Sequence, residues 1–172
     1  MRTTPRKNFR GFFRHAQSLV DRLVREEFPE LGYVWACPFV LHKAKDLARA
    51  HWYEEALDDA SVYRAIMLNA HTTWGKTFYL EVDDAELLNI LRHELLHGEM
   101  KRRGQPSGDE DLPFIMECLR RRIIVNDSSV GAFEAIHGRG SFDLFRALLP
   151  PPVVETVSLA EGAGVWLKEI AR

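Results

Sequence analysis

The feature that most constrains this sequence is a helical pattern of apolar residues that begins after Asp83. Four leucines of this stretch would fall within one quadrant of an α-helix and form its core-facing stripe; they are Leu87, Leu88, Leu91 and Leu95. Asp83 has the position of an N-cap, with Glu86 three residues later, and Gly104 stands where a helix commonly ends. The sequence therefore predicts a helix over about 84–103 that packs against a core.

The same helix carries His93, Glu94 and His97 in the spacing H-E-x-x-H. Residues four apart lie one turn apart on the same face, so both imidazoles can direct a ring nitrogen at one metal ion. Glu94 lies beside them, where its carboxylate can accept a proton from a water molecule that the metal activates. The motif therefore indicates zinc-dependent hydrolysis, with His93 and His97 as ligands and Glu94 as the general base.

A catalytic zinc ion needs a third protein ligand, and spacing alone leaves four side chains open; they are Asp109, Asp111, Glu117 and His137. The two aspartates belong to the loop at 104–111, where turn formation or N-capping of the next helix is their alternative role. Glu117 would be presented by that next helix, or would simply face solvent. His137 would approach from a distant loop, or would be an ordinary surface residue.

The rest of the chain predicts an α+β fold, with further helices packed on a small and mainly antiparallel sheet. Helices are expected over 8–28, 112–124, 141–149 and 158–171, and strands over 33–37, 48–53, 65–69 and 77–82. Pro29 and Gly32 would end the first helix, and Pro38 would interrupt the first strand. A turn is expected near 74–76.

Length and composition fit one domain over residues 1–172, with a formal net charge of −2. Three basic clusters, at 1–14, 101–103 and 120–122, are either solvated helix faces and a basic tail or a surface for DNA. Two isolated cysteines and the lack of a long apolar run predict a cytoplasmic protein with no membrane partner. Oligomeric state has no signal in the sequence.

Residues of about 64–124 resemble the SprT-like (Spartan-type) zinc metallopeptidases. The similarity lies in the apolar strand that ends in Leu68-Asn69, in the helix residues 90–97 around H-E-x-x-H, in Gly104 and in Phe114. The resemblance implies a minimal zincin-like domain with zinc between its helices and a small sheet. It also implies peptidase activity on protein or peptide substrates, often proteins attached to DNA.

The sequence departs from that family at the third ligand. The family pattern has a histidine on the loop after the active helix, and matching Gly104 and Phe114 without gaps puts Asp109 at that position. The resemblance therefore implies that Asp109 completes the zinc site, because a carboxylate can ligate zinc at nearly the same distance. Such an exchange would weaken zinc binding, favour a harder metal or accompany a lost activity. A cysteine-rich zinc ribbon, which some members add, is not present among these residues.

Two other interpretations of the motif follow from the same residues. The missing third histidine and the arginine clusters would suit a non-catalytic module that binds DNA or a protein on a zincin scaffold. A purely structural metal would also use two histidines, but it would gain nothing from a base such as Glu94 beside it.

Overall fold

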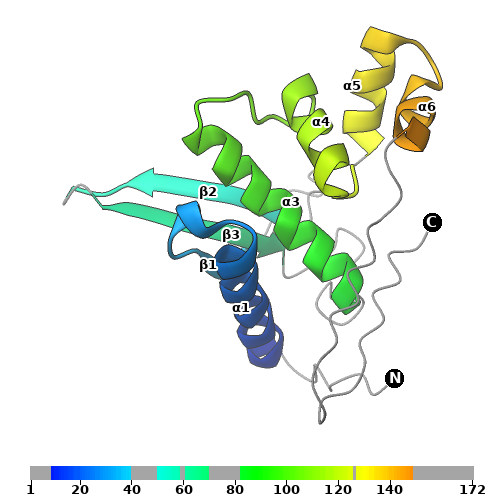
Figure 1. Cartoon of the computed structure of the whole chain (residues 1–172). Coiled ribbons are helices and arrows are strands. Elements are labelled where there is room, and N and C mark those ends of the chain that lie inside the picture. Colours follow the sequence, from blue (N-terminus) through cyan, green and yellow to red (C-terminus); the bar gives the residue numbers. More distant parts are fainter. Residues whose placement is uncertain (1–8, 40–49, 59–60, 70–81, 126, 149–172) are drawn as a thin grey trace, which may run out of the picture.

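The computed structural model of this chain describes residues 9–39, 50–58, 61–69, 82–125 and 127–148 (Figure 1). In chain order the elements are α1 (Phe9–Glu26), a short 3-10 helix η1 (Pro29–Leu31), β1 (Trp35–Phe39), β2 (Ala50–Ala56), β3 (Val62–Asn69), α3 (Asp84–Arg102), α4 (Leu112–Arg121), α5 (Asp127–His137) and α6 (Ser141–Leu148). Within these residues the helices pack on a three-stranded sheet. This is the α+β class that the sequence predicts.

The sheet has the strand order β1-β3-β2 and mixes both directions. β3 pairs antiparallel with β2 but parallel with β1, so the prediction of an antiparallel sheet was wrong for one of the two pairs. Pro38 lies within β1 and opposite Leu68, and it does not end the strand as expected. Because β1 is an edge strand of this described sheet, a residue without an N–H group can be accommodated there.

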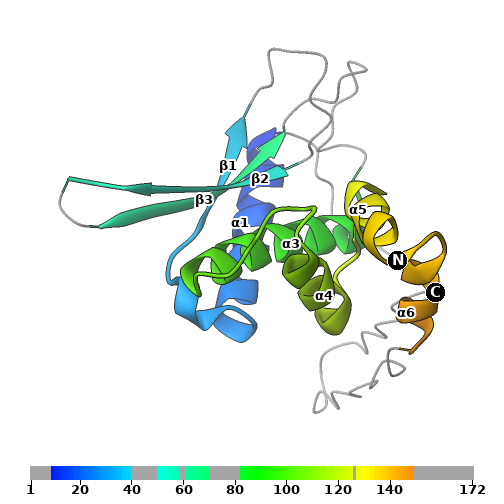
Figure 2. The ribbon, with the colours of Figure 1, turned by 90° about the horizontal axis from the view of Figure 1, so that it is seen from above.

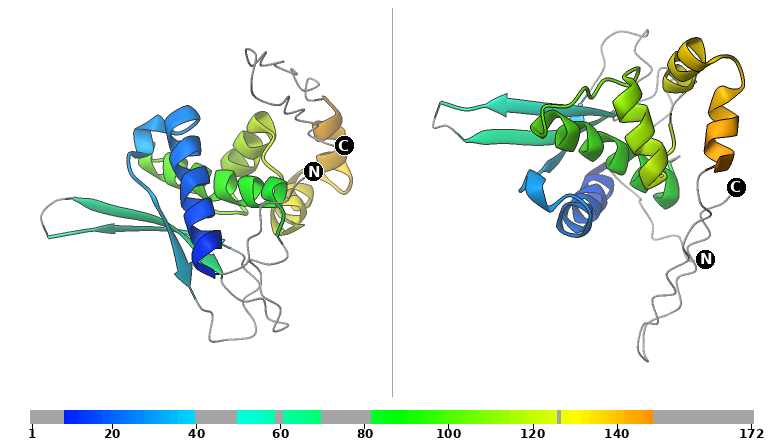
Figure 3. Two further views of the ribbon diagram at one scale, coloured as in Figure 1. Left: turned by 90° about the horizontal axis from the view of Figure 1, so that it is seen from below. Right: turned by 45° about the horizontal axis from the view of Figure 1, so that its top comes forward.

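The main core lies where α1, α3 and the sheet meet. The buried apolar residues of α1 recur at helical spacing; they are Phe12, Ala16, Leu19, Val20 and Leu23. The stripe predicted on α3 is confirmed, because Leu87, Leu91 and Leu95 are fully buried and Leu88 packs against the same cluster. Figures 2 and 3 show α3 as the central element, in contact with α1, β2, β3 and α4.

Both predicted ends of α3 are confirmed. Asp83 has extended backbone angles, and its carboxylate accepts a hydrogen bond from the backbone N–H of Glu86 at 2.8 Å. Such a cap stabilises a helix by about 1 kcal/mol. At the other end Gly104 has φ +66°, a left-handed conformation that glycine adopts at little cost.

The C-terminal helices differ more from the expectation. α4 ends at Arg121, three residues early, because Arg122 adopts a left-handed conformation with φ 58°. The backbone N–H of Ile123 then bonds the carbonyl of Cys118 and closes the helix end. α5 was not predicted, whereas α6 agrees with the helix expected over 141–149.

Some predictions fall on residues outside the described ranges. The turn near 74–76, the helix over 158–171 and all of the strand over 77–82 except Val82 lie there. Among the helices that are described, none combines the length and the apolar character needed to cross a membrane.

Candidate metal centre

α3 brings its two histidines and Glu94 together on one side, as the motif predicts. Each of the residues His93, Glu94 and His97 has one atom that could bind a metal, and these three atoms lie within 4.8 Å of one another. The two imidazole rings are 4.8 Å apart between centroids and are 12% and 15% exposed. The rings are therefore largely buried, yet one side of the pair faces the loop that follows the helix.

That loop presents Asp109 to both imidazoles. Its Oδ1 atom lies 2.9 Å from Nε2 of His93 and 3.5 Å from Nε2 of His97. Two ligand atoms that each lie about 2.0–2.1 Å from a tetrahedral zinc ion are about 3.4 Å apart. The two distances from Asp109 to the imidazole nitrogens are close to this separation. Of the acids that the sequence left open, Asp109 is thus the one that reaches the histidines.

Contacts around His97 leave its Nε2 atom free to face Asp109. Nδ1 of His97 donates to the backbone carbonyl of Ser107 at 2.5 Å, so Nε2 is the ring nitrogen that remains for Asp109 or for a metal ion. The ring stacks on the fully buried Phe114, with centroids 4.0 Å apart and planes 8° from parallel. Orientation of a ligating imidazole by such outer contacts is usual at metal sites.

Glu94 lies in an environment suited to a base. Its side chain is only 7% exposed, and this burial raises the pKa of its carboxyl group above the ordinary value. The positive charge of a protonated His97 or His93 opposes that rise, and burial outweighs it. A carboxylate with a raised pKa accepts a proton more readily near neutral pH.

Charge couples Asp109 to the histidines. Hydrogen bonds from His93 and then His97 hold the pKa of Asp109 far below its ordinary value, so this carboxylate is ionised at neutral pH. Burial would lower the pKa of His97, but the hydrogen bond with Asp109 and the charge of Glu94 outweigh it and the net shift is upward. The site therefore attracts a positive charge, either a proton or a metal cation.

The other three candidate ligands have different partners. Asp111 turns its carboxylate back to the N–H of Gly108 at 2.7 Å, so it stabilises the loop. It stands at the N-cap position of α4 without a capping hydrogen bond. Glu117 binds Arg120 and Arg121 through its carboxylate, with N–O distances of 2.5–2.7 Å.

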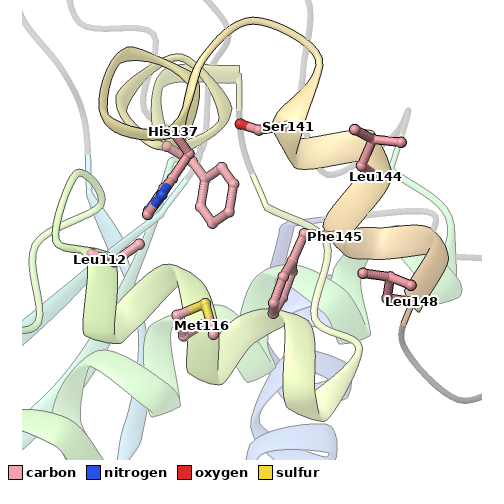
Figure 4. A pocket seen from close by; sticks show the side chains of 8 residues that line it. Leu112, Met116, His137, Ser141, Leu144, Phe145 and Leu148 are labelled. Carbon is pink, nitrogen blue, oxygen red and sulfur yellow. The ribbon is translucent and has the colours of Figure 1, made fainter.

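His137 lies away from the metal centre and is not on a loop. It is the last residue of α5, is exposed, and its ring packs on Phe133 with centroids 4.6 Å apart. Figure 4 shows it beside a mostly apolar pocket of about 340 Å³ between α4, α5 and α6. Its neighbours there include Leu112 and Ser141, and neither of these can ligate a metal well.

The donors at the centre fit zinc. Two imidazole nitrogens and a carboxylate oxygen form a set that zinc uses in catalytic sites, with a fourth position left for water or substrate. The carboxylate of Asp109 lies 2.9 and 3.5 Å from the two imidazole nitrogens, so the three side chains converge on one point. The presence of Glu94 beside them adds the proton acceptor that hydrolysis requires.

Sequence reasoning missed two contributors to this site. The backbone carbonyl of Ser107 orients His97, and the hydroxyl of Ser129 on α5 donates to the backbone carbonyl of Asp109. Neither contact has a sequence signal, because every residue has a backbone carbonyl and a lone serine in a helix is compatible with many roles. Phe114, which the resemblance singled out, proves to be the ring against which both histidines pack.

The basic clusters at 101–103 and 120–122 are largely paired with acids. The closest pairs join Arg102 to Glu30, Arg103 to Glu99, Arg121 to Glu99 and Arg120 to Glu117 at 2.5–2.7 Å, and Lys101 lies 3.3 Å from Glu54. These charges serve contacts within the fold, so they offer less support for a DNA surface than the sequence alone suggested. The first eight residues of the basic N-terminal segment lie outside the described part.

Comparison with known proteins returned no matching family model, no matching curated protein and no matching solved structure. The resemblance to SprT-like peptidases therefore stays a prediction from the residues quoted above.

Proposed function

We propose that this protein is a zinc-dependent metallopeptidase in which His93, His97 and Asp109 hold the metal and Glu94 is the general base. The observation that carries the proposal is the approach of Asp109 to both imidazoles, at 2.9 and 3.5 Å, beside a buried Glu94. Three ligands and a base in this arrangement are the requirements for metal-assisted hydrolysis of an amide.

Each residue of the site has its own role in the proposed hydrolysis. A zinc ion at this position would lower the pKa of a water molecule and polarise a substrate carbonyl. Glu94 accepts the proton of that water as its oxygen attacks the carbonyl carbon, and later delivers the proton to the leaving amine nitrogen. Asp109 contributes a negative charge that balances the cation, while Ser107 and Phe114 keep the ring of His97 in place.

The metal is tested first, by elemental analysis of untagged protein. Wild type should contain about one zinc per chain, and Asp109→Ala should retain much less. Glu110→Ala is the matched control, since Glu110 is an exposed acid on the same loop and should leave the zinc content unchanged. Equal zinc in wild type and Asp109→Ala, with loss in Glu117→Ala, would move the third ligand to Glu117. Absence of zinc from wild type, even after incubation with the metal, would refute the proposal.

The base is tested by proteolysis of a casein-like substrate. Glu94→Gln should keep the metal but lose activity by about 10²–10⁴-fold, because the amide cannot accept the proton. Glu110→Gln again serves as the control and should retain full activity. Unchanged hydrolysis by Glu94→Gln would show that the assigned mechanism is wrong.

A non-catalytic binding module is the second candidate, favoured by the aspartate in place of a third histidine. It predicts salt-sensitive DNA binding that survives removal of the metal by a chelator. A retardation assay at low salt separates the two functions, and the same DNA added to the proteolysis assay tests whether DNA-bound proteins are the preferred substrates.

A further inference from the structure

We propose that Ser129 of α5 is a positioning residue that holds Asp109 in reach of the metal. The proposal rests on the proposed function, because it takes Asp109 to be a ligand. It adds a residue that lies 32 positions beyond His97 and on a helix that makes no other contribution to the site described above. The connecting contact is the hydrogen bond from the Ser129 hydroxyl to the backbone carbonyl of Asp109.

Asp109 needs such support because it stands on a loop. Its side chain is 43% exposed, so packing on neighbouring side chains restrains it less than it restrains the histidines. Two other contacts shape the loop: the carbonyl of Ser107 accepts a hydrogen bond from His97 of α3, and the N–H of Gly108 donates to Asp111 across Asp109. The bond from Ser129 acts on the backbone of the ligand residue itself, and it comes from outside the loop.

Burial and the packing of α5 fix the position of Ser129. It is fully buried, and buried hydroxyl groups are almost always hydrogen-bonded. The helix that carries it is anchored by Phe133, 4% exposed, which packs with Ile115 of α4 in a cluster of its own. α4 begins directly after the loop and holds its C-terminal end, while α5 contacts the loop at Asp109.

Loss of the hydroxyl should therefore act on metal binding more than on folding. Without Ser129 as donor, the carbonyl of Asp109 can turn to solvent and the loop can adopt other conformations, in which the carboxylate no longer meets the histidines. Removal of an outer contact at a metal site commonly weakens binding by about 10–100-fold. We expect Ser129→Ala to bind zinc about tenfold more weakly than wild type.

The test measures zinc affinity by competition with a chromogenic chelator in four proteins: wild type, Ser129→Ala, Asp109→Ala and the double variant. Val130→Ala is the matched control, since Val130 is the next residue of α5 and packs on the same apolar cluster. Circular dichroism first establishes that each protein is folded at the temperature used. Visible absorption of the cobalt-substituted proteins then reports the ligand geometry independently of activity.

The expected result is a tenfold loss in Ser129→Ala, a change below about twofold in Val130→Ala, and an altered cobalt spectrum in Ser129→Ala. In the Asp109→Ala background, Ser129→Ala should have no further effect, because the residue it positions is gone. Additive losses in the double variant, or wild-type affinity in Ser129→Ala, would overturn the role of Ser129 alone. Failure of wild type to bind zinc at all would overturn the proposed function together with this inference.

Discussion

The described part of the chain has two apolar clusters, which differ in size and in what they support. The larger cluster joins α1, the sheet, α3 and one side of α4, through Phe114 and Cys118, and many of its side chains are fully buried, such as Phe12, Ile66 and Leu91. The smaller one joins the other side of α4 to α5 and α6 around Phe133 and Phe142, and the pocket beside Phe133 is also lined by Leu148, which is 82% exposed. Figure 1 shows α5 and α6 at the end of the molecule away from β2 and β3.

The proposed metal centre combines parts from both clusters. His93 and His97 stand on a helix that the larger cluster fixes along its length. Asp109 stands on a loop whose outer support, through Ser129, comes from the smaller cluster. The geometry of the histidines should therefore be insensitive to loss of the contact from Ser129, whereas the position of Asp109, the proposed third ligand, should depend on it.

The largest loss of stability is expected on breaking the ion pair that joins α4 to α3. Arg121 of α4 lies 2.6 Å from Glu99 of α3, and both side chains are largely buried, at 15% and 6% exposed. Arg121→Met would leave the buried Glu99 with one fewer partner, and removal of one member of a buried pair costs about 3–5 kcal/mol. Urea denaturation of Arg121→Met should show a loss of this order in the free energy of unfolding.

Arg120→Met is the control for that measurement. Arg120 pairs with Glu117 on the same helix but its side chain is 67% exposed, so its removal should cost less than about 1 kcal/mol. If both variants lost the same stability, the connection between the two regions would not depend on the buried pair.

A comparison of two leucines tests the difference between the clusters directly. Leu91→Ala opens a cavity in the larger cluster, for which a loss of about 2–5 kcal/mol is expected. Leu119→Ala removes a side chain of the smaller cluster, where partly buried neighbours such as Val125 and Val130 can move into the space, so its cost should be at the lower end of that range. Equal losses in urea denaturation would mean that both clusters are packed equally tightly.

A smaller effect is expected at the contact between α3 and β2. A Cβ atom on Gly98 would lie 2.4 Å from the indole of Trp52, closer than real carbon atoms approach. Gly98→Ala should therefore destabilise the protein by about 1–3 kcal/mol through overpacking, despite the better helix propensity of alanine. Thermal unfolding gives the measurement, and Trp52→Leu in the same chain should restore part of the loss. A higher melting temperature for Gly98→Ala alone would contradict this close contact.

Local sequence signals sufficed for α3 and for the helical part of the site. The period of the leucines, the cap at Asp83 and the glycine at position 104 all act within a few residues of the chain, and all are confirmed. Because His93 and His97 lie on this one helix, their mutual geometry follows from the helical repeat alone.

Non-local features could not be predicted in the same way. The parallel pairing of β1 with β3 joins segments about 30 residues apart, and no local pattern encodes its direction. The prediction that Pro38 interrupts the first strand was wrong because the position of β1 at the edge of the described sheet depends on that pairing. α5 was missed because Ser128, Ser129 and Gly131 weaken its helix propensity, so it depends on packing against α4 and α6.

The smallest effect concerns Glu117, the acid that the sequence offered as an alternative ligand. Hydrogen bonds first from Arg120 and then from Arg121 lower the pKa of its carboxyl group from the ordinary 4.5 to about 2. A group with a depressed pKa stabilises the fold above its unfolded value, and this contribution is lost as the pH falls from about 4.5 towards 2. Because Arg120 is mostly exposed and screened by water, we expect only about 1 kcal/mol.

The difference in unfolding free energy between wild type and Glu117→Gln isolates this contribution from other titrating acids. It should be about 1 kcal/mol at pH 6 and should shrink at pH 3, where protonation of Glu117 becomes favourable in the unfolded chain. If Glu117 were instead the third metal ligand, the difference at pH 6 would grow when zinc is added. A difference that is independent of zinc would leave Glu117 as a link within α4, and Asp109 would stay the proposed ligand.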